Sequence, residues 1–241
     1  MKQPDDNALS FSAEQIDELL NNGSLERLGM GTRRACYRLP GSDLCVKCYR
    51  SEEEIAEGKY PWQKPFKPLS PSAVREIRRY RFDEKRNTCC KEYEYWKELR
   101  DSLPKDLMAV FPTTMAKMLL PSRGWCVLEE LMENSDGSPP AKLFREFKLA
   151  SSSSRAALAA SLDRIASELL RLAVRIYDPQ NLLLQKDSDG AFRIRIADFE
   201  PSSRTIVSFD RFPFVVRMKL RRRFARYRKM FGIYGASTAE I

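Results

Sequence analysis

The chain of 241 residues is 43% hydrophobic and 31% charged, which is enough apolar material for a buried core and argues against wholesale disorder. It contains no histidine, which excludes a histidine general base, a Ser-His-Asp or Cys-His catalytic site, and imidazole ligation of zinc. The longest apolar runs are far shorter than the ~20 residues that cross a bilayer, and the first residues lack the basic-then-apolar pattern of a signal peptide. Because six cysteines also suit a reducing compartment, we expect a cytoplasmic protein.

The positive charge is concentrated near the C-terminus. The whole chain has a formal net charge of +9, from 42 basic and 33 acidic residues. Residues 201–241 hold ten of the basic residues but only two acidic ones, Asp210 and Glu240, so the first 200 residues are nearly balanced. This asymmetry needs an explanation of its own.

The pattern of apolar, capping and turn residues predicts a mixture of strands and helices. Ser12 and Gln15 form a capping-box pattern, which predicts a short helix that Gly23 closes. The other predicted elements are a β-hairpin over 25–50 around the turn 40–43, a long proline-rich connection over 51–73, helices over 73–103, strands over 108–120 and 124–132, a helix over 155–174, and strands over 182–185 and 192–197. Strands come mostly first and helices mostly later, which predicts the α+β class.

A basic helix is predicted near the C-terminus, from apolar residues at helical spacing: Val216, Leu220, Phe224, Tyr227 and Phe231. Eight basic residues, with no acidic residue between them, lie over Arg217–Lys229. One interpretation is that the apolar stripe packs against the protein while the basic face is only solvated. The other is that the basic face binds an anionic partner. An acidic membrane surface is the first choice, which would place the protein on the inner membrane face, and an acidic protein or nucleic acid is second.

Two glycines near the N-terminus, Gly29 and Gly31, resemble half of a phosphate-binding loop. Glycine lets the backbone approach an oxyanion and direct amide N–H groups at it. Arg34 stands where a third glycine is expected, and two glycines in a hairpin also occur in ordinary turns.

Lys47 lies within an apolar run, between Cys45 and Cys48. An ammonium group is costly to bury unless it finds an anion, and Glu92 on a downstream predicted helix offers one. The alternative is a lysine on the exposed face of an edge strand. The two cysteines have no second pair at zinc spacing, so we expect them to pack within the strand.

Two further polar residues flank the last predicted strands. Asn181 precedes one apolar strand and Asp198 follows the next. If these two strand ends lie together, the amide and the carboxylate form a hard-oxygen site that suits Mg²⁺.

Together these features follow the order of the protein-kinase-like fold: glycine loop, strand lysine, helix glutamate, strand to a hinge, long helix, catalytic loop and Asp-Phe-Gly. Within that superfamily the chain resembles the YrbL family of bacterial PhoP-regulon proteins, in four segments: Arg34–Arg38, Leu44–Lys47, Val127–Leu131 and Asp136–Gly137. The resemblance implies a two-lobed kinase-like fold with a reduced C-terminal lobe. The expected parts are an extension with a short helix (1–23), an N-lobe (24–132), a reduced C-lobe ending in the basic helix (133–232) and a tail (233–241).

The resemblance also implies cofactors and residue roles. ATP and Mg²⁺ would be the ligands, with Gly29 and Gly31 near the phosphates. Lys47 would contact the α- and β-phosphates and pair with Glu92. Residues Glu129 to Leu131 would form the hinge beside adenine. Asn181 and Asp198 would hold Mg²⁺.

The chain departs from the kinase pattern at the catalytic loop. Ile176 takes the place of the aspartate base, and Glu200 takes the place of the last glycine of Asp-Phe-Gly. Because isoleucine cannot accept a proton, we expect a pseudokinase with a regulatory role and little phosphoryl transfer. One alternative is an atypical phosphotransferase that uses Asp178 or Glu200 and acts on a protein, a small molecule or an envelope saccharide. A nucleic-acid-binding module is a third hypothesis, which the lack of a recognised motif disfavours.

Overall fold

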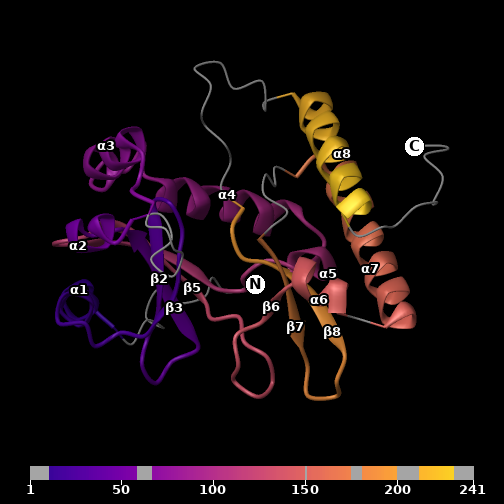
Figure 1. Cartoon of the computed structure of the whole chain (residues 1–241). Coiled ribbons are helices and arrows are strands. Elements are labelled where there is room, and N and C mark those ends of the chain that lie inside the picture. The colour runs from indigo at the N-terminus through magenta and orange to yellow at the C-terminus, as the bar shows by residue number, and fades with distance from the viewer. Residues whose placement is uncertain (1–10, 59–66, 150, 175–180, 200–211, 231–241) are drawn as a thin grey trace. The chain divides into compact units, whose positions relative to one another are not determined.

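The computed structural model describes residues 11–58, 67–149, 151–174, 181–199 and 212–230 (Figure 1). These residues form helices and two antiparallel sheets, which confirms the predicted α+β class. The chain divides into two compact units. Unit 1 comprises residues 1–94 and 114–131, and unit 2 comprises residues 95–113 and 132–241.

Unit 1 contains a five-stranded antiparallel sheet in the order β1-β2-β3-β5-β4. Its strands are β1 (Arg27–Met30), β2 (Arg34–Arg38), β3 (Leu44–Tyr49), β4 (Met115–Leu120) and β5 (Gly124–Glu130). The helices that begin in this unit are α1 (Ala13–Asn21), α2 (Glu52–Ala56), α3 (Pro71–Tyr80) and α4 (Thr88–Ser102), and the last of these continues into unit 2. The predicted hairpin is confirmed, because β2 pairs with β3 across the turn at 40–43.

Helix α1 forms where the capping pattern predicts it. The Ser12 side chain accepts from the Gln15 N–H, the Gln15 side chain accepts from the Ser12 N–H, and Gly23 has a φ of +72° after the helix end. Ile16 and Leu20 are buried in the same cluster as residues of the sheet. The neighbouring Asp17 is also buried and accepts hydrogen bonds from the Ser122 N–H and hydroxyl groups. These contacts hold α1 against the β4–β5 end of the sheet.

The prediction of a connection without regular structure over 51–73 is wrong at α2. A second capping box, between Ser51 and Glu54, starts this helix. Glu54 is buried, and Arg123 pairs with it at 2.7 Å. The Tyr37 hydroxyl also donates to this carboxylate, so α2 is held to the sheet by buried polar contacts.

The six cysteines all lie in unit 1 as free thiols, five of them buried. Burial raises the pKa of Cys48 to about 12 and that of Cys89 to about 11. Cys45 and Cys48 are buried within β3, as expected for strand packing.

Unit 2 contains a three-stranded antiparallel sheet in the order β6-β7-β8. Its elements are α5 (Lys105–Met108), β6 (Ala141–Lys142), α6 (Leu143–Leu149), α7 (Ser152–Arg171), β7 (Leu182–Lys186), β8 (Phe192–Ile196) and α8 (Pro213–Met230). The long helix and the last two strands were predicted from the sequence, whereas β6 and α6 were not. The strand predicted over 108–120 is wrong in its first half, because α5 ends at Met108 and β4 begins only at Met115.

Helices α7 and α8 lie side by side in unit 2 (Figure 1). Val216, Leu220 and Phe224 of α8 are buried, so the predicted apolar stripe is used for packing. Phe231 lies outside the described residues. Within the described ranges, no helix has both the length and the apolar character that crossing a membrane requires.

The C-terminal end of α7 has an unusual backbone conformation at Ala173, whose φ is +53°. The Val174 N–H donates to the Leu169 carbonyl at 2.9 Å, and the Ala173 N–H donates to the Leu170 carbonyl at 3.2 Å. This is the Schellman pattern, which normally places glycine at the left-handed position because a Cβ is strained there.

Replacing Ala173 with glycine is therefore expected to stabilise the protein by about 0.5–1 kcal/mol, since relief of the strain exceeds the added entropy of the unfolded chain. Urea denaturation measures the change. The matched control is Ala160→Gly, at an exposed interior position of the same helix, which should destabilise the protein by about 1 kcal/mol. A loss of stability in both variants would contradict the assignment of strain to Ala173.

Candidate functional site

Lys47 lies on the central strand of the five-stranded sheet, with β2 on one side and β5 on the other. All six residues of β3 are buried, and Lys47 is 9% exposed. The alternative interpretation, an exposed lysine on an edge strand, is therefore wrong. An ammonium group at such a position needs anionic partners.

Two carboxylates provide them. The Lys47 Nζ lies 3.5 Å from Glu92 Oε1 and 2.7 Å from Glu129 Oε1. Glu92 comes from α4 and is fully buried, and Glu129 comes from β5 and is 3% exposed. The structure thus brings together the lysine and the helix glutamate that the sequence pointed to, and it adds Glu129 at the shorter distance.

Arg34 completes this cluster. Its guanidinium group donates to Glu92 Oε2, so Glu92 lies between two cations. No ion pair of Arg34 is predicted from the sequence, in which this residue stands in place of a glycine and begins the segment Arg34–Arg38. Its position at the start of β2, opposite Tyr49 of β3, brings it to the same side of the sheet as the α4 carboxylate.

The two carboxylates of the cluster differ in their electrostatic surroundings. Burial raises the pKa of Glu129 to about 7, although the nearby Lys47 ammonium acts in the opposite direction. The Cys45 thiol, 3.8 Å from Glu129 Oε1, adds only a weak hydrogen bond. Glu129 can therefore change its charge near neutral pH while it remains in contact with Lys47.

The glycine segment forms a tight hairpin between β1 and β2. The Gly31 N–H donates to the Arg34 carbonyl at 2.8 Å, so this amide is used within the turn. Gly29 lies in β1 without a left-handed φ, and a Cβ built there meets no atom within 4 Å. The pairing of β1 with β2 shifts register between Arg27 and Gly29, an irregularity of the kind at which glycine is common in strands, and the space beside Gly29 is open.

The segment expected to form the hinge is largely part of the sheet. Glu129 lies inside β5 opposite Cys45, with its side chain on Lys47. Leu131 follows the strand, is buried, and its N–H donates to the Asp43 carbonyl at 2.7 Å. In this structure the Leu131 N–H is thus already used and does not offer a donor to an adenine ring.

In unit 2, Asn181 and Asp198 lie next to each other, because the β7–β8 pairing brings the start of one strand to the end of the other. The Asn181 Nδ2 donates to the Asp198 carbonyl at 3.4 Å, and the Ala197 N–H donates to the Asn181 carbonyl at 3.2 Å. Phe199 is buried against Phe111, with ring centroids 5.3 Å apart, which anchors the chain beyond Asp198. Both polar side chains are partly exposed.

The donor set at this place consists of one amide and one carboxylate, which are hard oxygen ligands of the kind that Mg²⁺ takes together with phosphate and water. Among the described residues no group of three or more His, Cys, Asp or Glu side chains could hold a metal ion. Ile176, Asp178 and Glu200, on which the predictions about catalysis depend, lie outside the described residues.

No protein-family model and no curated protein matches this chain. Function is therefore inferred from the two groups of side chains described above: the Lys47 cluster in unit 1 and the Asn181–Asp198 pair in unit 2.

Proposed function

We propose that this protein is a kinase-like nucleotide-binding protein with a regulatory role, a pseudokinase similar to the YrbL family, with a two-lobed fold in which unit 1 is the N-lobe. The observation that carries the proposal is the buried Lys47 with its helix glutamate, Glu92. A lysine on a central strand that pairs with a helix carboxylate is the arrangement with which kinases bind the α- and β-phosphates.

Stability alone gives a poor reason for this cluster. Desolvating two cations and two carboxylates costs more than burying apolar side chains of similar size, so ion pairs of this kind are weak evidence for a stabilising role. Binding of an anionic ligand by Lys47 would explain why these charged side chains are buried together. The open space above Gly29 supports the same proposal, since phosphates need close approach to the backbone.

The Glu129 carboxylate would compete with a bound phosphate for the Lys47 ammonium group. This carboxylate is nearer to Lys47 than Glu92 is, so a phosphate would have to displace it or meet it in the protonated form. With a pKa of about 7, Glu129 is partly protonated near neutral pH, which lowers the cost of releasing Lys47 to a ligand.

In unit 2, we propose that Asn181 and Asp198 hold Mg²⁺, which would neutralise phosphate charge when the nucleotide is bound. In the sequence before Asn181, Ile176 takes the place of the catalytic base, so we propose nucleotide binding without efficient phosphoryl transfer. The atypical phosphotransferase remains the second proposal, and it depends on Asp178.

Isothermal titration with ATP, with and without Mg²⁺, tests the proposal. We expect saturable binding that weakens at least tenfold in Lys47→Met and loses its Mg²⁺ dependence in Asp198→Asn, because each variant removes one direct contact. Matched controls are the exposed Lys142→Met and Asp101→Asn, which should bind as the parent does. Calorimetry measures binding directly, so a change in stability caused by losing a buried charge does not mimic the result.

Absence of binding at millimolar ATP, or equal affinity in Lys47→Met, would overturn nucleotide binding. If binding is confirmed, incubation with radiolabelled ATP and a panel of proteins and saccharides separates the two proposals. Transfer that disappears in Asp178→Asn would favour the phosphotransferase.

A further inference from the structure

The inner face of α8 is occupied by contacts with α7. Besides the buried stripe, Arg217 donates to the carbonyls of Leu170 and Arg171 at the C-terminal end of α7, at 3.0 and 2.9 Å. Arg228 pairs with Asp163 of α7 at 2.8 Å. Arg217 and Arg228 therefore have a structural role. The side chains on the surface of α8 that faces away from α7 need a different explanation.

The beginning of α8 exposes large apolar side chains. Phe212, Phe214 and Met218 are 51%, 67% and 43% exposed. The two phenyl rings lie with centroids 6.0 Å apart. Seven large apolar residues are exposed in the described part of the chain, and three of them fall within these seven consecutive positions. Such clustering, unlike single exposed apolar residues, marks a contact surface.

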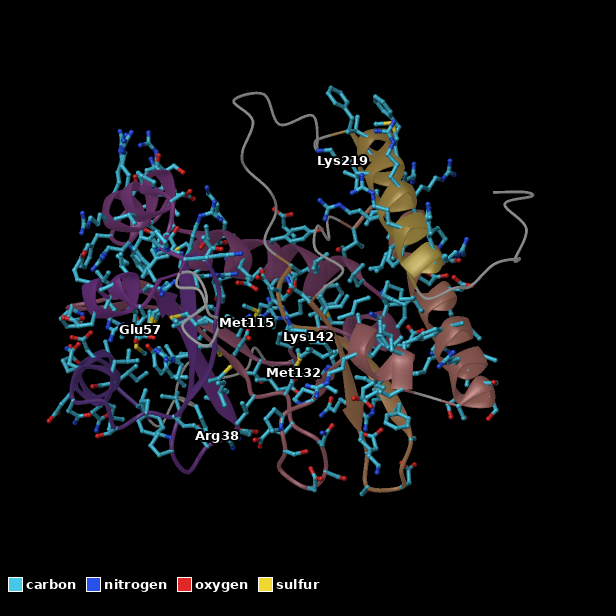
Figure 2. The ribbon with its side chains drawn as sticks, viewed as in Figure 1. Arg38, Glu57, Met115, Met132, Lys142 and Lys219 are labelled. Atoms are coloured by element: carbon cyan, nitrogen blue, oxygen red, sulfur yellow. The ribbon has the colours of Figure 1, made fainter. Side chains whose placement is uncertain are left out.

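Positive charge follows this apolar patch along α8. No acidic residue occurs between Phe212 and Met230, and the first turn of α8 has none to offset the positive end of the helix dipole. Arg222, Arg226 and Lys229 are exposed along the same helix. Nitrogen-tipped side chains project along the length of α8, with Lys219 labelled near its beginning (Figure 2).

We propose that the first turns of α8 form a contact surface for anionic membranes, a role independent of the proposed nucleotide binding. Phe212, Phe214 and Met218 would enter the boundary between headgroups and acyl chains, while Arg222 and Arg226 bind the negative headgroups. Aromatic residues at one end of a basic helix suit a lipid surface, because its interface has both an apolar layer and a layer of anionic charge. A nucleic-acid backbone or an acidic protein surface would use the charge and leave the apolar patch exposed to water.

Cosedimentation of the full chain with vesicles tests the proposal, using phosphatidylcholine alone or mixed with phosphatidylglycerol. Binding is expected only to the mixed vesicles at about 0.1 M NaCl, and it should be largely lost at about 1 M, where the screening length falls to about 3 Å. In Phe214→Trp, the added tryptophan emission should shift to shorter wavelength when these vesicles bind, because the ring leaves water.

Two paired variants separate the apolar and ionic contributions. Phe212→Ser/Phe214→Ser and Arg222→Glu/Arg226→Glu should each weaken vesicle binding by ~10-fold or more. The matched controls are Leu149→Ser/Phe192→Ser, which removes two apolar residues elsewhere in unit 2 that are also more than half exposed, and Lys105→Glu/Arg145→Glu, which reverses two exposed charges there. Both controls should bind as the parent does.

Three results would overturn the proposal: equal partitioning to neutral and mixed vesicles, no binding at low salt, or full binding by the Phe212→Ser/Phe214→Ser variant. The last of these would indicate a purely ionic surface of the kind that nucleic acids and acidic proteins recognise. Because all substituted residues are exposed, circular dichroism should show an unchanged fold in every variant.

Discussion

Replacing Gly124 with alanine is expected to lower the free energy of unfolding by about 3–4 kcal/mol. Gly124 begins β5 with a φ of +77°, and a Cβ there would lie 2.1 Å from the Arg81 carbonyl oxygen. That oxygen accepts from the Trp125 N–H at 2.8 Å and from Asn87 Nδ2 at 2.9 Å, so moving it away breaks two hydrogen bonds. Thermal unfolding should shift down by roughly 10 °C.

Gly29→Ala is the matched control for this experiment, because its Cβ has open space and its φ is not left-handed. We expect its melting temperature to stay within about 2 °C of the parent. If the melting temperatures of Gly124→Ala and Gly29→Ala fell equally, neither the left-handed backbone nor the close approach to Arg81 would require glycine at 124.

The stability of the protein is expected to fall as the pH rises from about 4.5 to about 7, through the titration of Glu129. Its pKa is about 7 in the folded state and close to 4.5 in the unfolded chain, so the folded state holds this proton more tightly. Stability from this group is therefore complete below pH 4.5 and is lost as the pH rises through 7. The difference of about 2.5 pKa units corresponds to about 3 kcal/mol.

Urea denaturation of the parent and Glu129→Gln at several pH values isolates this effect, since all other titrating groups are shared. Stability of the variant relative to the parent should increase by about 3 kcal/mol between pH 4.5 and 7.5. ATP should also bind the variant more tightly above pH 7, because a neutral amide competes less for Lys47. Parallel pH curves for the parent and Glu129→Gln would contradict this account.

Local signals in the sequence were sufficient for elements that their own residues determine. The Ser12–Gln15 capping pair, the turn around Gly41 and the apolar stripe of α7 all correspond to observed structure. The prolines after residue 60 favoured a loop and hid the second capping box at Ser51, because a capping signal without a long apolar pattern is weak.

The site could be predicted only in part, because its members come together through strand register and helix packing. The contact between Lys47 and Glu92 is predicted from the order of the strand lysine and the helix glutamate in the kinase-like pattern. Glu129 is brought to Lys47 by the pairing of β3 with β5, in which it lies opposite Cys45. Two adjacent glutamates, Glu129 and Glu130, end this strand, and the strand register decides that the first of them is buried beside the lysine. Arg34 gave no comparable signal, since arginine is common at exposed hairpin ends.

The confinement of all six thiols to unit 1 offers a way to observe the two units separately. Alkylating reagents react with the thiolate, and burial both shields these sulfurs and keeps them protonated. Modification of the five buried cysteines then requires local opening, so its rate under native conditions measures how often unit 1 exposes its interior. Unit 2 contributes no background to such a measurement, and a single cysteine introduced there, in a chain whose own cysteines are replaced, would carry a fluorophore or spin label at a chosen site.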